Sequence, residues 1–157
     1  MLQLFIAKWT HPDYPPDTVS VEQLQQVERE FGFHYPADYR NAVLRFGLPR
    51  PTLALLNAIV ERDISLHCVS DFFSPGEAIE QTVGWREIGL SDGLVAFASD
   101  ESGNLFCFDT AELSSEDMDR SAVWFYDHDF NEAEVVSYSF TAWIEAYSKI
   151  ERVSELE

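Results

Sequence analysis

Apolar residues recur at helical spacing in the first third of the chain. Residues 20–31 place them on one stripe, and Ser20 with Gln23 can form a capping box at the start of that stretch. Gly32 follows, a residue suited to the left-handed conformation that ends many helices. Residues 36–46 repeat the helical spacing after an opening proline. The two stretches predict a pair of helices joined as a helical hairpin.

Two further helices are predicted from their capping residues. Residues 74–85 begin with Ser74 and Pro75, and Glu77 stands at the third helical position, which is typical of a helix start. Ser139 caps the last predicted helix in the same manner. The apolar stripe of that last helix consists of Phe140, Trp143, Ile144, Tyr147 and Ile150. A stripe of this width needs a partner surface, which we expect to be a sheet.

Runs rich in apolar and β-branched residues predict the strands of that sheet. The runs are residues 53–60, 64–72, 94–98, 104–109 and 122–127. The first run also contains alanine and leucine residues that suit a helix, which stays the alternative for it. A polar, glycine-containing turn separates the third run from the fourth and predicts a hairpin. Because helices and strands do not alternate as βαβ units, we expect a single α+β domain: an antiparallel sheet with an N-terminal αα-hairpin and a C-terminal helix packed against it.

The start of the chain is predicted to differ from the rest. Residues 10–19 contain three prolines, which neither a helix nor a central strand tolerates well. We therefore expect regular structure to begin after this segment. The predicted organisation is an N-terminal lead-in at residues 1–19 and one domain at residues 20–157, a length that suits a single core.

Acidic residues are in excess in this sequence, and they are unevenly distributed along the chain. The 157 residues include 28 acidic and 10 basic ones, for a net charge of −18. Residues 1–78 carry 10 acids and 6 bases, whereas residues 79–157 carry 18 acids and 4 bases, so the excess lies in the second half. Direct nucleic-acid binding needs lysine and arginine against the phosphates, and we expect none here. Self-repulsion of this size favours a cationic partner, with a solvated acidic face as the alternative.

Other features of the sequence bear on compartment and redox state. The two cysteines, Cys68 and Cys107, lie in apolar runs far apart along the chain, so we expect reduced, buried thiols. The first residues lack the basic leader and apolar stretch of a signal peptide, and no segment approaches 18 apolar residues. We expect a cytoplasmic protein with no membrane partner.

Catalytic and metal-binding motifs are scarce in this sequence. None of the four histidines lies within four positions of another, and no phosphate-binding or zinc-protease motif occurs. The sharpest candidate is the run from Asp127 through His128 to Asp129, which could hold a metal or act as acid and base. Strand alternation places the two aspartates on one face and the histidine on the other, so a solvated strand end is favoured. We expect no metal, no cofactor and no enzymatic activity.

Four segments of the chain carry family-like motifs: residues 27–40, 96–109, 123–129 and 139–144. In this order they resemble the SUKH superfamily, which includes the yeast cell-wall assembly regulator family and bacterial toxin-immunity proteins. Residues 27–40 resemble its E-x-x-x-G-x-x-L-P-x-D/E-Y opening. Residues 96–109 resemble its central hairpin, residues 123–129 its V-x-x-x-D-H strand, and residues 139–144 its closing helix. The resemblance implies an α+β fold, no catalysis and work done by binding.

Charge clustering and the resemblance together predict a function. The favoured hypothesis is a bacterial immunity protein that binds a cognate toxin with a basic surface, plausibly a nuclease. The alternatives are a regulatory or scaffold module and, third, a metal enzyme using Asp127, His128 and Asp129. The predicted contact residues are Asp100, Glu101, Glu116, Asp117, Asp119, Asp127, Asp129, Glu132 and Glu134, with Trp124 as an apolar anchor.

Overall fold

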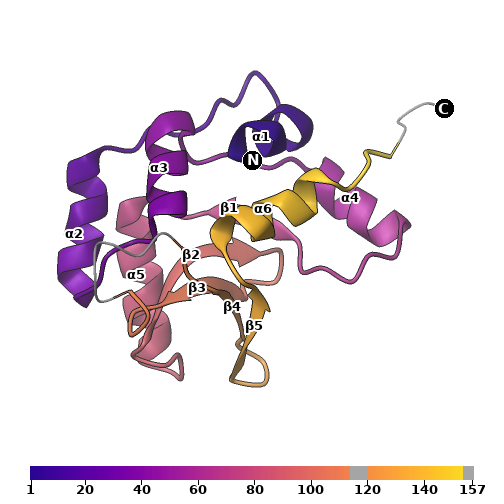
Figure 1. Ribbon diagram of the computed structural model, residues 1–157. Helices are drawn as coiled ribbons and strands as arrows, with labels where there is room; N and C mark the ends of the chain where they lie inside the picture. The colour runs from indigo at the N-terminus through magenta and orange to yellow at the C-terminus, as the bar shows by residue number, and fades with distance from the viewer. Residues whose placement is uncertain (114–119, 154–157) are drawn as a thin grey trace.

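The computed structural model describes residues 1–113 and 120–153, which form one α+β domain (Figure 1). Its helices are α1 (Leu2–Trp9), α2 (Val21–Phe31), α3 (Ala37–Phe46), α4 (Leu53–Glu61), α5 (Pro75–Arg86) and α6 (Phe140–Ser148). Its strands are β1 (Val69–Phe72), β2 (Leu94–Asp100), β3 (Leu105–Asp109), β4 (Val123–Asp127) and β5 (Glu132–Ser137). The predicted fold class is confirmed.

The five strands form an antiparallel meander in the order β1-β2-β3-β4-β5, with β1 and β5 at its edges. Alternation along the strands gives the sheet two apolar faces. One face carries Phe97, Phe106 and Phe125, which belong to the large core under α1, α3 and α6. The opposite face carries Ala96 and Cys107 and forms a smaller core with α5.

Aromatic contacts hold α3 and α6 on the sheet. The ring of Tyr39 in α3 lies 5.5 Å from Phe97 and 5.3 Å from Phe108, centre to centre. Trp143 in α6 lies 4.8 Å from Phe106 and 5.2 Å from Phe97. These edge-on and tilted geometries are the favoured ones for aromatic pairs, so the closing helix is fixed over the centre of the sheet.

The capped helices and the central hairpin are as the sequence predicts. Ser20 and Ser74 each form a complete capping box, with Gln23 and Glu77 as their respective partners. Ser139 accepts a hydrogen bond from the amide of Ala142 at the start of α6. In each case the side chain satisfies an amide that the first helical turn leaves without a partner, which is why sequence alone locates these ends.

The expectation that regular structure begins only after residue 19 is wrong. Helix α1 precedes the proline-rich segment, and Phe5 and Trp9 are fully buried in the large core. The indole N–H of Trp9 donates to the carbonyl of Tyr147 at 3.0 Å, and Lys8 Nζ donates to the carbonyls of Ser148 and Ile150. The N-terminal helix therefore closes the C-terminal end of α6.

Two strand predictions also need correction. Residues 53–60 lie in helix α4, the alternative left open for this run, and do not form a strand. Thr52 is the N-cap of the helix, and its buried residues at helical spacing are Leu55, Ala58 and Ile59. Only the end of the run 64–72 is a strand, namely β1, because the preceding residues cross the sheet face before they reach its edge. Strand β5 was not predicted at all.

No helix in residues 1–113 and 120–153 is long and apolar enough to span a lipid bilayer.

Candidate functional site

Two acidic turns meet at one end of the sheet. Asp100 ends β2 and Glu101 follows it in the turn to β3, and the turn after β4 contains Asp129. The side-chain oxygen of Asn104 accepts a hydrogen bond from the amide of His128 at 3.1 Å, which ties the two turns together. Acidic residues distant in sequence are thereby gathered on one rim.

The carboxylate of Asp100 is used inside its own turn. It accepts hydrogen bonds from the amides of Ser102 and Asn104 at 2.9 and 2.8 Å, and from the side-chain amide of Asn104 at 3.1 Å. The residue is only 8% exposed, whereas the neighbouring Glu101 is exposed. Asp100 shapes the hairpin, and Glu101 offers its charge to solvent.

The β4–β5 hairpin carries the acids that lie closest in register. Asp127 lies directly opposite Glu132, and Phe125 lies opposite Glu134. Alternation puts all four residues on the same face of the sheet. Like charges directly opposite one another on an antiparallel pair destabilise it, so this arrangement costs the isolated protein stability.

A groove runs beside these acids, and we call it the β4–β5 groove. It has a volume of about 390 Å³ and is lined by His67, Phe125, Asp127, Glu132, Ala133 and Glu134. The imidazole of His67 stacks on Phe125 with ring centres 3.7 Å apart and planes inclined by 4°. The hydroxyl of Tyr147 donates to the carbonyl of His67, which fixes this crossing segment. The groove is therefore acidic at its walls and aromatic at its base.

A second hollow continues the groove toward α6. It has a volume of about 190 Å³ and shares His67 and Glu134 with the first. Leu66, Val136 and Trp143 also line it, so it is more apolar than the groove itself. The two hollows together give a surface with an acidic part and an apolar part.

In the run from Asp127 to Asp129, Asp127 ends β4 and the next two residues lie in a turn. Asp127 accepts a hydrogen bond from the amide of Asp129 at 2.9 Å, and His128 lies 5.1 Å from the ring of Trp85 in α5. Nε2 of His128 is 3.5 Å from a carboxylate oxygen of Asp129. Within residues 1–113 and 120–153, no three histidine, cysteine or acidic side chains are grouped so as to hold a metal ion.

The proposed anchor Trp124 lies on the other face of the sheet from the groove. It packs, partly buried, against the smaller core beside α5. Its indole N–H is buried without a hydrogen-bond partner in the part of the chain that the structure describes. The predicted residues Glu116, Asp117 and Asp119 fall outside the described residues.

Three groove residues were not among the predicted contacts, namely Ala133 and the stacked pair of His67 and Phe125. The sequence showed His67 only as a neighbour of Cys68, and Phe125 only as one apolar residue of a strand. Their stacking joins segments 58 positions apart along the chain. No local sequence pattern predicts such a contact, although the alternation of β4 does place Phe125 on the same face of the sheet as Asp127.

Both cysteines are free and buried, as predicted. Burial raises the pKa of Cys68 to about 12, with smaller contributions from the charges of Glu101 and Asp100. Burial also raises the pKa of Cys107 strongly. Both side chains are protonated at neutral pH and have no thiolate to offer as a nucleophile.

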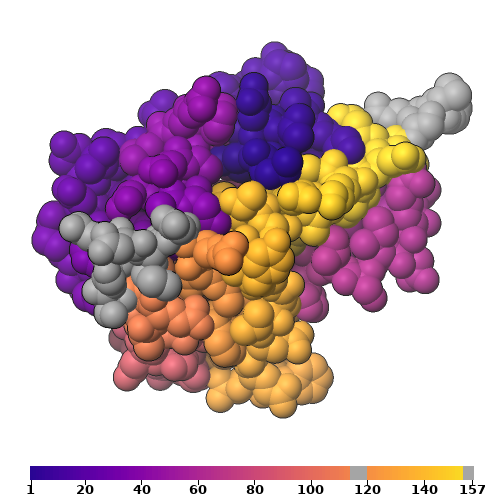
Figure 2. Space-filling model, in the orientation of Figure 1, coloured from indigo at the N-terminus to yellow at the C-terminus, as the bar shows by residue number. Residues whose placement is uncertain are grey.

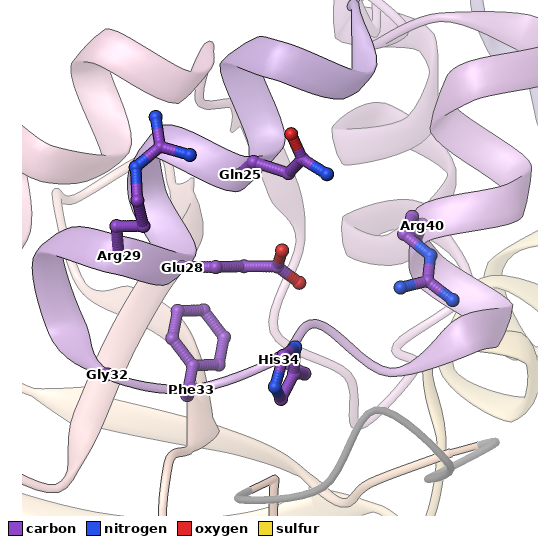
Figure 3. Close-up of a pocket in the computed structure, with 7 residues that line it drawn as sticks. All are labelled: Gln25, Glu28, Arg29, Gly32, Phe33, His34 and Arg40. Atoms are coloured by element: carbon purple, nitrogen blue, oxygen red, sulfur yellow. The ribbon is translucent and has the colours of Figure 1, made fainter.

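A further hollow lies between α2 and α3, with a volume of about 440 Å³ (Figure 3). Gln25, Glu28 and Arg40 point toward its middle, with His34 below them. Glu28 accepts a hydrogen bond from the amide of Tyr35 at 2.7 Å, so its carboxylate holds the connection between the two helices. Its lining mixes both charges, in contrast to the uniformly acidic wall of the β4–β5 groove.

The fold and its surface define a class of protein: an α+β domain with a meander sheet, whose most distinctive surface is an acidic groove at one sheet edge. A comparison with known families matches residues 18–146 to the SMI1 / KNR4 family (SUKH-1). The chain belongs to this family, as the resemblance of its four segments predicted. A search of the curated proteins found no match.

Proposed function

We propose that this protein is an immunity protein, which binds and neutralises a cognate polymorphic or contact-dependent toxin, a nuclease being the favoured class. The observation that carries the proposal is the acidic wall of the β4–β5 groove, in which Asp127 and Glu132 oppose each other. The SUKH family, to which the chain belongs, includes immunity proteins.

A basic partner fits this wall for an electrostatic reason. Opposed carboxylates repel each other in the free protein. A cationic partner surface attracts both carboxylates and thereby offsets their mutual repulsion. A nuclease presents cationic groups to phosphates, so an acidic inhibitor both complements it and attracts it over a distance. The contact surface we assign consists of Glu101, Asp127, Asp129, Glu132 and Glu134.

A regulatory or scaffold module of the cell-wall assembly regulator type is the alternative, because the resemblance to the SUKH superfamily includes that family as well. The same acidic groove would then bind a protein of the host cell. Gene neighbourhood separates the two, since an immunity gene stands beside a toxin gene.

The test is co-expression with the protein encoded by the adjacent gene. An immunity protein restores growth to cells that express the toxin and co-purifies with it. The Glu132→Lys/Glu134→Lys variant should lose both effects, whereas Glu30→Lys/Glu61→Lys, which changes net charge equally on exposed helix ends, should keep them. Rescue that is equal for the two double variants would contradict the assigned surface, and no rescue by the wild type would contradict the immunity role.

A further inference from the structure

Strand β5 is an open edge of the sheet. It pairs with β4 on one side, and no other segment of residues 1–113 and 120–153 pairs with it. Residues 132–135 are exposed, and the orange surface of this hairpin protrudes beyond the helices in Figure 2. An edge strand presents a row of amide and carbonyl groups that another extended chain can pair with.

We propose that β5 takes an extended basic segment of a protein partner as a sixth strand. The inference rests on the proposed function in taking a basic protein as the partner, and it adds how that protein docks. Strand addition supplies backbone hydrogen bonds along the edge, and alternate side chains of the added strand then face the two sides of the sheet.

The charges of β5 select what can pair with it. Glu132 and Glu134 share the groove face, so the partner strand would place basic side chains over them at every second residue. A second copy of this chain would instead bring glutamates against glutamates, which opposes edge-to-edge self-association. The occupant is therefore a basic strand of another protein.

The groove favours arginine in that strand. Its wall carries Asp127, Glu132 and Glu134, and its base is the stacked pair of His67 and Phe125. A guanidinium pairs with carboxylates through two parallel hydrogen bonds and also lies flat on aromatic rings. A lysine ammonium offers the charge without either geometry.

The opposite side of β5 favours apolar side chains in the alternate positions. Val135 is 51% exposed on that side, opposite Trp124. Two more large apolar residues flank the strand, Phe130 before it at 73% exposure and Tyr138 after it at 70%. The partner strand should therefore alternate basic and apolar or β-branched residues.

A pair of synthetic peptides tests the inference. The first has the order Thr-Arg-Val-Arg-Val-Arg-Thr, and the second has the same residues as Thr-Val-Arg-Arg-Arg-Val-Thr. Both carry equal charge, so attraction by the acidic surface alone binds them equally in a fluorescence anisotropy titration. Strand addition predicts that the alternating peptide binds about tenfold more tightly. It also predicts slower hydrogen exchange at the amides of residues 132–137.

Methylation of single peptide amides gives a second measurement that leaves the protein unchanged. Successive amides of a strand point to opposite edges, so only one of two neighbouring amides faces β5. The two amides to compare are those of the central arginine and of the next valine. A methyl group on the amide that faces β5 should abolish tight binding, whereas a methyl group on the other amide should leave the affinity unchanged. Equal effects of the two methylations, together with equal affinity for the two peptide orders, would overturn strand addition.

These outcomes are separate from those of the proposed function. Peptides that bind by strand addition, combined with no rescue on co-expression, would overturn the immunity role and keep the docking mode. Rescue that depends on Glu132 and Glu134, combined with peptides that show no order dependence, would overturn the docking mode and keep the immunity role.

Discussion

Asp38 and Asp100 use their carboxylates inside the fold, whereas Glu132 and Glu134 leave theirs in solvent. Asp38 in α3 accepts hydrogen bonds from the amide and hydroxyl of Thr141, in the first turn of α6, at 3.1 and 3.2 Å. Burial raises the pKa of Asp38, and these hydrogen bonds oppose that rise. The carboxylates of Asp38 and Asp100 therefore stabilise the fold, whereas those of the exposed Glu132 and Glu134 are accessible to a partner.

Glu132 should lower the stability of the free protein. Replacement Glu132→Lys turns the repulsion with Asp127 into an attraction and should raise the free energy of unfolding by roughly 0.2–1 kcal/mol in low salt. The gain should shrink in high salt because screening acts on exposed charges. Urea denaturation at two ionic strengths measures both effects. A stability loss, or a gain that does not depend on salt, would contradict the opposed-charge description of this hairpin.

At the scale of elements, α1 is part of the domain's structure although it precedes the proline-rich segment. Its last turn supplies Lys8 and Trp9 to the carbonyls at the end of α6. A lysine at a helix C-terminus satisfies carbonyls that have no partner within the helix and matches the negative end of its dipole. Two helices at opposite ends of the chain are thus joined.

Matched variants within α1 test its contribution. Trp9→Ala removes a fully buried indole and its hydrogen bond, and should lower the free energy of unfolding by about 3–5 kcal/mol. Leu4→Ala, at a position that is 56% exposed, should change it by less than about 0.5 kcal/mol. Similar, small losses for both variants in urea denaturation would show that α1 is dispensable for the fold.

The elements that sequence predicted are those whose signal is local. Examples are the capping boxes at Ser20 and Ser74 and the turn after Asp100. Each depends on residues only a few positions apart, so each can be predicted without the rest of the chain. For residues 53–60 a strand was predicted with a helix as the alternative, because a continuous apolar run suits either structure. Burial of Leu55 and Ile59 in the core decided in favour of the helix, α4.

Strand β5 and the groove depend on contacts that no local pattern shows. The alternating glutamates of β5 weaken its strand propensity, and pairing with β4 overrides that preference. The predicted acids Asp127, Glu132 and Glu134 do come together, because adjacent strands of a hairpin bring them together. The stacking of His67 on Phe125 could not be predicted from sequence, because it depends on the path that the segment before β1 takes in the folded domain.

At the scale of the whole molecule, the acidic residues that give the net charge of −18 are unevenly distributed. Six of the 18 acids in residues 79–157 lie at the joined turns and along the β4–β5 groove, next to exposed apolar residues of β5. A field concentrated on one edge directs a cationic partner to that edge, whereas the same charge spread evenly would only raise solubility. We propose that this edge, and not total charge, determines binding.

The rate of association with the cognate toxin of the proposed function is the most direct test of this proposal, measured by stopped-flow fluorescence over a range of salt concentrations. Glu132→Lys/Glu134→Lys should slow association by about tenfold at low salt and flatten its salt dependence. Glu30→Lys/Glu61→Lys, with the same change in net charge, should stay within about twofold of the wild type. Equal slowing by the two double variants would contradict the account, because net charge and not the β4–β5 groove would then control the encounter.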